Sequence, residues 1–95
     1  MKPHQKILIV DDNPVNIAVL NDVLSNDYIT ETTSNAHDVI KLASNFRPDL
    51  ILLDVTMPEV NGYDICRNIR KNTSFSRSKI ILLSVNGIYR TNQRL

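Results

Sequence analysis

The sequence predicts an α/β fold in which helices cover both faces of a parallel sheet. Three apolar runs of four residues each, rich in branched side chains, are spread along the 95 residues: Ile7–Val10, Leu50–Leu53 and Ile80–Leu83. Runs that are apolar on both faces are typical of central strands in a parallel sheet, because helices bury both sides. Helical patterns lie between the runs, and this alternation predicts right-handed crossover connections.

The first helix is predicted to begin at Asn13-Pro14, where Asn is a favourable N-cap and Pro fits the first helical position. Its apolar face is formed by Ile17, Leu20 and Leu24. The next segment, Tyr28 to Thr33, mixes Ile with Thr and Glu. That composition favours an edge strand.

A second helix is predicted with Ser34 or Asn35 as its cap and apolar residues at helical spacing: Ala36, Val39, Ile40 and Ala43. It must end before Arg47-Pro48, since a residue that precedes Pro is pushed out of the helical region. A third helix is expected after Gly62, with Ile65, Cys66 and Ile69 facing inward.

The pattern weakens after Leu83. Asn86-Gly87 indicates a turn, and residues 88–95 are predicted to begin one more helix. The run Ile80–Leu83 is then expected to be a bare sheet edge, or to pair with something absent from the chain.

Composition and charge indicate one domain, with residues 1–5 as a tail and residues 6–95 as the domain. Hydrophobic residues make up 42% of the chain and charged residues 22%, ordinary values for a globular protein. No apolar run is long enough to cross a bilayer, no signal peptide is evident, and a single cysteine suits a reducing cytoplasm.

Residues 1–64 carry 4 basic and 10 acidic side chains (−6), whereas residues 65–95 carry 7 basic ones and no acid (+7). We interpret the basic part as solvated surface and expect no direct nucleic-acid binding, because aromatic residues are not interleaved with it.

Acidic residues directly follow two of the apolar runs: Asp11-Asp12 the first, and Asp54 the second. If these two strands are neighbours, as in the flavodoxin-like order, their carboxyl ends meet where ligands bind in such sheets. Crowded carboxylates need a cation or a proton, and hard oxygen ligands suit Mg²⁺. A carboxylate beside Mg²⁺ is also a plausible nucleophile toward phosphorus. Each acid alone, and likewise Ser84, can be a helix cap or turn residue; their shared position at run ends favours a site.

The sequence resembles the receiver domain of two-component response regulators from Lys6 to about Gly87. The matching segments are Lys6-Ile-Leu-Ile-Val-Asp-Asp12, Pro48-Asp-Leu-Ile-Leu-Leu-Asp54, Met57-Pro58 with Gly62, and Lys79-Ile-Ile-Leu-Leu-Ser84. The resemblance implies a flavodoxin-like three-layer sandwich with strand order 2-1-3-4. It also implies a regulatory domain that assists its own phosphorylation, rather than an enzyme acting on other substrates.

Roles for individual residues follow from the resemblance. It implies that Asp54 accepts a phosphoryl group from a phosphohistidine on a sensor histidine kinase or a histidine phosphotransfer protein. It implies that Asp12, Asp54 and the backbone carbonyl of Thr56 ligate Mg²⁺ directly, with Asp11 acting mainly through a water. Ser84 would be the hydroxyl that moves toward the phosphoryl oxygens. The loop after the acceptor would be shaped by Met57, Pro58 and Gly62.

Two departures from the family stand out. Receivers place a lysine at the end of a fifth strand to pair with the phosphate, and no lysine follows Lys79 here. Val85 stands where the family usually has a smaller residue, which would narrow access to the acyl phosphate. Tyr89 sits too early to be the family's switch aromatic and is interpreted as a helix residue. We therefore expect a receiver that lacks its fifth strand and last helix and forms a homodimer or exchanges strands through the exposed edge. Its phosphorylation is expected to be slow or absent.

Three other functions compete with this prediction. A dehalogenase-like phosphatase needs a second Asp two residues after the nucleophile, where Thr56 stands. A nucleotide-binding domain needs several glycines in its phosphate loop, and the chain has only Gly62 and Gly87. A degenerate receiver that acts only as a protein-interaction module stays open: the missing lysine and Val85 favour it, and the acidic trio opposes it.

Overall fold

The computed structural model describes residues 5–54, 62–71, 78–84 and 87–91. It contains a five-stranded sheet. Its strand order is β2-β1-β3-β4-β5. The strands are β1 (Lys6–Val10), β2 (Ile29–Thr33), β3 (Leu50–Asp54), β4 (Lys79–Ser84) and β5 (Gly87–Thr91). The first four strands are parallel, so the predicted order 2-1-3-4 is confirmed.

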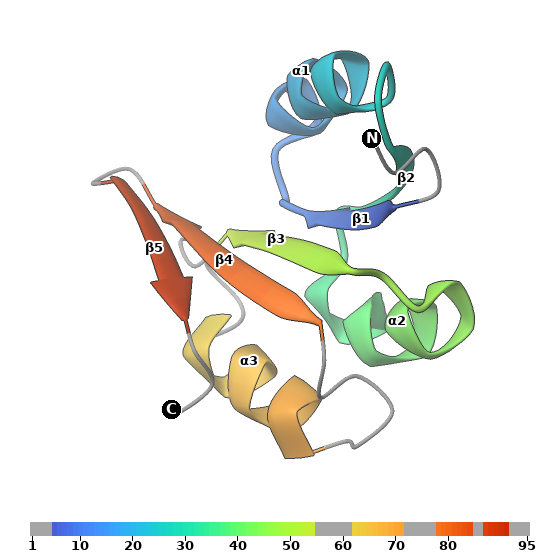
Figure 1. The fold of residues 1–95 in the computed structure, drawn as a ribbon. Helices are drawn as coiled ribbons and strands as arrows, with labels where there is room; N and C mark the ends of the chain where they lie inside the picture. Colours follow the sequence, from blue (N-terminus) through green and yellow to red (C-terminus); the bar gives the residue numbers. More distant parts are fainter. Residues whose placement is uncertain (1–4, 55–61, 72–77, 85–86, 92–95) are drawn as a thin grey trace.

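Helices lie on both faces of this sheet, as predicted (Figure 1). One face carries α1 (Pro14–Leu24), and the other carries α2 (Val39–Phe46) and α3 (Gly62–Lys71). None of the helices in the described part of the chain is long and apolar enough to cross a membrane.

The main core lies between the sheet and the α2–α3 layer. Alternate residues of the central strands point to this side, because side chains along a strand alternate between faces. They pack with residues of α2 and α3 in one buried cluster: Leu8, Val10, Ile51, Leu53, Ile80 and Leu82 from the strands, and Val39, Ala43 and Ile69 from the helices. The predicted inward positions Val39, Ala43 and Ile69 are thus confirmed.

The start of α1 and the end of α2 follow the predicted signals, whereas α2 begins later than predicted, at Val39 with Asp38 as its N-cap rather than Ser34 or Asn35. Asn13 caps α1, its side-chain oxygen accepting hydrogen bonds from the backbone N–H groups of Val15 (2.8 Å) and Asn16 (3.3 Å). A short 3₁₀ turn, η1 (Ala36–Asp38), precedes α2, and the side-chain oxygen of Asn35 accepts from the N–H of His37 in it. The α2 helix ends before Arg47, whose φ of 55° is left-handed, so the chain leaves the helix ahead of Pro48.

The segment after β4 is a strand, which corrects several predictions. Gly87–Thr91 forms β5 and pairs antiparallel with β4, with Ser84 opposite Gly87 and Leu82 opposite Tyr89. The expected helix from residue 88 is therefore wrong as far as Thr91, and Tyr89 is a strand residue. The β4 strand is neither a bare edge nor paired with something absent from the chain. The sheet also has a fifth strand where none was expected, although this strand runs antiparallel to β4. Ile, Tyr and Thr favour strands, so the composition of β5 is compatible with the pairing.

Candidate metal centre

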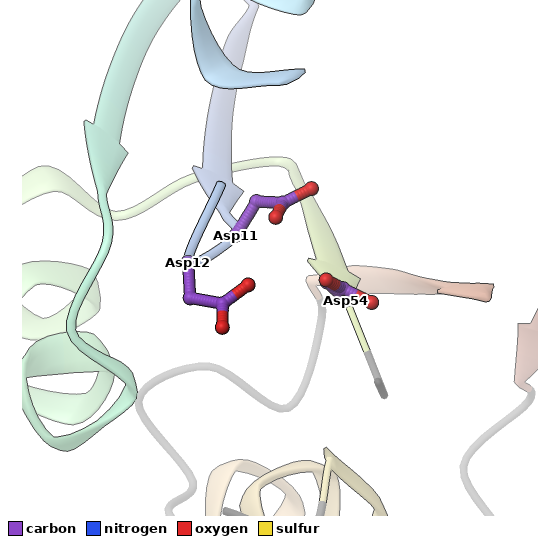
Figure 2. Close-up of side chains that lie close together, drawn as sticks. All are labelled: Asp11, Asp12 and Asp54. Atoms are coloured by element: carbon purple, nitrogen blue, oxygen red, sulfur yellow. The ribbon is translucent and has the colours of Figure 1, made fainter. Parts of the chain in front are cut away.

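The register of the sheet brings three carboxylates to one point. Val10 of β1 pairs with Leu53 of β3, so the residues that follow, Asp11 and Asp54, stand at neighbouring strand ends. Asp12 is the next residue along the chain. One carboxylate oxygen from each of the three aspartates lies within 4.8 Å of the others. Figure 2 shows the three side chains at the ends of β1 and β3, where the sequence predicted that they would meet.

The three acids differ in their exposure to solvent. Asp11 and Asp54 are buried, with 4% and 7% of their surface exposed, whereas Asp12 is exposed. The backbone N–H of Asp11 donates to the carbonyl of Thr33 at 3.2 Å, which ties the end of β1 to that of β2. The cluster therefore has two carboxylates in the floor and one at the rim.

Two asparagines at the start of α1 hold the Asp11 carboxylate in place. The backbone N–H of Asn13 donates to Oδ1 at 2.9 Å, and the side-chain amide of Asn16 donates to Oδ2 at 3.3 Å. Asn13 was predicted as the helix cap, but the contact of Asn16 with Asp11 was not predicted. The available signal was an amide five residues after the first acid, in a helix whose neighbouring positions are apolar.

Burial and like charge act together on Asp11. Burial raises the pKa of its carboxyl above the usual range, and the negative charge of Asp54 and a hydrogen bond with it add to this rise. The hydrogen bonds from Asn13 and Asn16 act in the opposite direction on the same pKa, because they stabilise the carboxylate. The pKa of Asp11 is raised on balance, so burial and the neighbouring Asp54 outweigh the two asparagine donors.

A hard divalent cation fits this donor set. All the clustered ligands are oxygens, two of them are buried, and a nearby positive charge would lower the cost of ionising Asp11. The exposed position of Asp12 leaves the rim of the cluster open to solvent. Mg²⁺ suits such a site because it usually keeps several waters and takes few carboxylates.

The remaining predicted site residues are described less completely. Thr56, Met57 and Pro58 lie outside the described residues. Gly62 is the first residue of α3, one position before the predicted start of that helix. Ser84 is the last residue of β4, one position beyond Leu83, which pairs with Asp54. Its backbone thus lies at the end of the strand next to β3, and its hydroxyl lies outside the described part of the structure.

Comparison with known proteins gives a consistent result. The model of the response regulator receiver domain family matches residues 7–94. The polar-differentiation response regulator DivK of Brucella anthropi is 30% identical over 81 residues, which cover 84% of this chain and 66% of DivK. A probable cyclic di-GMP phosphodiesterase of Vibrio cholerae is 33% identical over 78 residues, 82% of this chain and 18% of that protein. The match thus spans 18% to 66% of the length of these curated relatives.

A solved structure extends the likeness to three dimensions. The receiver domain of sensor histidine kinase PA1611 from Pseudomonas aeruginosa superimposes with a TM-score of 0.79 at 34% identity. The superposition covers 87% of this chain and 69% of that one. That structure holds a magnesium ion coordinated in its active-site cleft.

Proposed function

The chain belongs to the family of response regulator receiver domains of two-component systems, and we propose that Asp54 is its phosphoryl acceptor. The observation that carries this proposal is the convergence of the Asp11, Asp12 and Asp54 carboxylates within 4.8 Å. Asp54 is the acid best placed for the role, because it ends a central strand and is buried next to the rim acid.

In the proposed reaction, a carboxylate oxygen of Asp54 attacks the phosphorus of a phosphohistidine. The O–P bond forms as the P–N bond breaks, and the histidine nitrogen keeps the electron pair and takes up a proton. The donor is a sensor histidine kinase or a histidine phosphotransfer protein. The receiver contributes position and charge compensation, which account for most of the catalysis of phosphoryl transfer.

The other acids are proposed to hold a Mg²⁺ ion. Asp12, Asp54 and the backbone carbonyl of Thr56 would be direct ligands, and Asp11 would act through a water. When bound, the ion would neutralise the acidic cluster and the oxygens of the incoming phosphoryl group. Asn13 and Asn16 keep Asp11 oriented, and the Ser84 hydroxyl is proposed to bind the phosphoryl group once it is on Asp54.

Labelling with small phosphodonors tests the proposal. We expect acetyl phosphate to add one phosphoryl group, and beryllofluoride to bind, only when Mg²⁺ is present. Asp54→Asn should abolish both, while Asp38→Asn, which changes an exposed acid outside the cluster, should abolish neither. Intact mass spectrometry detects the phosphoryl adduct, and ¹⁹F NMR detects the beryllofluoride complex.

The same measurement separates the alternative function. A degenerate receiver acting only as an interaction module would bind neither reagent at any Mg²⁺ concentration. Labelling that persists in Asp54→Asn would instead show that another residue is the acceptor.

A further inference from the structure

The carboxylate of Asp11 is held on both of its oxygens. The backbone N–H of Asn13 donates to Oδ1 at 2.9 Å, and the side-chain amide of Asn16 donates to Oδ2 at 3.3 Å. Each oxygen of a carboxylate has about two acceptor positions, so one position on each oxygen of Asp11 is already occupied. The side chain is also buried. Any rotation of this carboxylate toward an ion therefore strains or breaks one of the two bonds.

The neighbouring acid is not held in this way. Asp12 is exposed, and none of the described residues donates a hydrogen bond to its carboxylate. Figure 2 shows the two acids at adjacent positions after β1. The cluster thus combines one carboxylate that is fixed by hydrogen bonds with one that can adjust to an ion.

The position of Asn16 in α1 explains its contact with Asp11. Asn13 is the N-cap of α1, so Asn16 is the third helical residue, and side chains there point back toward the start of the helix. In a capping box such a side chain accepts the N–H of the N-cap. Here Asp11 accepts that N–H, and Asn16 donates to Asp11. The first donor is a backbone group that any residue except proline supplies, whereas the second depends on the side chain at position 16.

Mg²⁺ and Ca²⁺ make different demands on a cluster of this kind. Mg²⁺ takes few carboxylates and keeps several of its waters. Ca²⁺ takes about six to eight oxygens, and it often binds both oxygens of one carboxylate. An Asp11 that is fixed and acts through a water suits Mg²⁺, and it withholds from Ca²⁺ the additional protein ligands that this ion favours.

We propose that Asn16 makes this centre select Mg²⁺ over Ca²⁺, by holding Asp11 in the position from which it acts through a water. The inference rests on the proposed Mg²⁺ site. Asn16 is a positioning residue, because it acts on the ion only through Asp11. Without its amide, Oδ2 of Asp11 is released and can bind a larger ion directly.

Isothermal titration calorimetry with MgCl₂ and with CaCl₂ tests the proposal on the 95-residue chain. We expect the ratio of the Ca²⁺ to the Mg²⁺ dissociation constant to fall by about tenfold or more in Asn16→Ala, the size of effect typical of groups behind a metal ligand. Asn16→Asp has nearly the same shape but replaces the donor by a like charge, so it should lower the ratio at least as far. Asn21→Ala removes an amide that bonds Thr30 on the same helix and should leave the ratio unchanged.

A crystal structure gives a readout that is independent of affinity. In Asn16→Ala with Ca²⁺, an oxygen of Asp11 should lie within about 2.6 Å of the ion, the usual length of a direct Ca²⁺–oxygen bond. In the parent chain with Mg²⁺, a water should lie between Asp11 and the ion. Circular dichroism should show the variants folded, since Asn16 is exposed.

The results distinguish this inference from the proposed site. If Asn16→Ala weakens the binding of both ions by the same factor, the inference is wrong and the Mg²⁺ site stands, because Asn16 then supports ion binding in general. A direct bond from Asp11 to Mg²⁺ in the parent chain would overturn the inference in the same way. If Asp12→Asn leaves the affinity of the parent chain for both ions unchanged, the proposed site itself is wrong.

Discussion

At the scale of single residues, the raised pKa of Asp11 makes a prediction about stability. The Asp11 carboxyl binds its proton more tightly in the folded state than in the unfolded chain. Its contribution to the free energy of unfolding is therefore fully present below the pKa of the unfolded chain. It is lost as the pH rises through the folded pKa. In Mg²⁺-free buffer, Asp11→Asn should therefore stabilise the protein at about pH 7 relative to the parent, by on the order of 1 kcal/mol, and have less effect near about pH 4.

Thermal unfolding over this pH range measures the effect. The asparagine keeps an acceptor oxygen for the backbone N–H of Asn13, and the Asn16 amide can turn its oxygen toward the new NH₂ group, so the change mainly removes the charge. A variant less stable than the parent at neutral pH would show that the donors around Asp11 outweigh its burial and the charge of Asp54.

Asn16 makes a second prediction at this scale. Its amide is the side-chain donor that orients Oδ2 of Asp11, so Asn16→Ala should weaken Mg²⁺ binding by roughly 10-fold or more, as changes to groups behind a metal ligand typically do. Asn21→Ala is a matched control on the same helix, because Asn21 bonds Thr30 and not the cluster. Isothermal titration calorimetry gives both affinities, and equal losses would show an effect of helix stability alone.

At the scale of elements, a buried hydrogen bond ties the start of β4 to the start of β3. The hydroxyl of Ser78 donates to the carbonyl of Pro48 at 2.7 Å, and the N–H of Lys79 donates to the carbonyl of Asp49 at 2.9 Å. Ser78→Ala removes the only hydroxyl in this pair of contacts. It should lower the free energy of unfolding by about 1–3 kcal/mol, because the buried carbonyl loses its donor.

Urea denaturation checks this value, with Ser44→Ala as a control at an exposed serine. Equal midpoints for the two variants would mean that water replaces the lost hydroxyl at the carbonyl.

The elements also show what could be predicted from the sequence. The three apolar runs became central strands because four adjacent branched residues are compatible with burial on both faces. The strand at Gly87–Thr91 was mistaken for a helix, because five residues without alternation or caps do not distinguish the two. The segment is a strand because it pairs with β4, and a local sequence pattern does not reveal which strands pair.

The candidate site was predictable to the same degree. Asp11, Asp12 and Asp54 were found because each follows an apolar run, and parallel strands carry their ends to one edge. Asn16 was missed because its contact with Asp11 depends on the angle at which α1 leaves β1. That angle is a result of packing and leaves no periodic trace in the sequence.

At the scale of the whole molecule, the acid cluster links metal binding to folding. The three carboxylates come from residues 11, 12 and 54, which only the folded sheet brings within 4.8 Å. A ligand that binds only the folded state stabilises it, by about 2.7 kcal/mol at 100 times its dissociation constant. For a domain of this size, each kcal/mol raises the unfolding temperature by roughly 4–8 °C.

We therefore expect saturating Mg²⁺ to raise the unfolding temperature, relative to NaCl at matched ionic strength. Asp54→Asn and Asp12→Asn should each lose most of this rise, because each removes a proposed ligand. Asp27→Asn, which changes an exposed acid outside the cluster, should retain it. Differential scanning calorimetry at several protein concentrations separates this effect from dimerisation, since only the dimer makes the unfolding temperature depend on protein concentration. A rise of the same size in Asp54→Asn would place the ion elsewhere on the acidic half of the chain and remove the basis for Asp54 as acceptor.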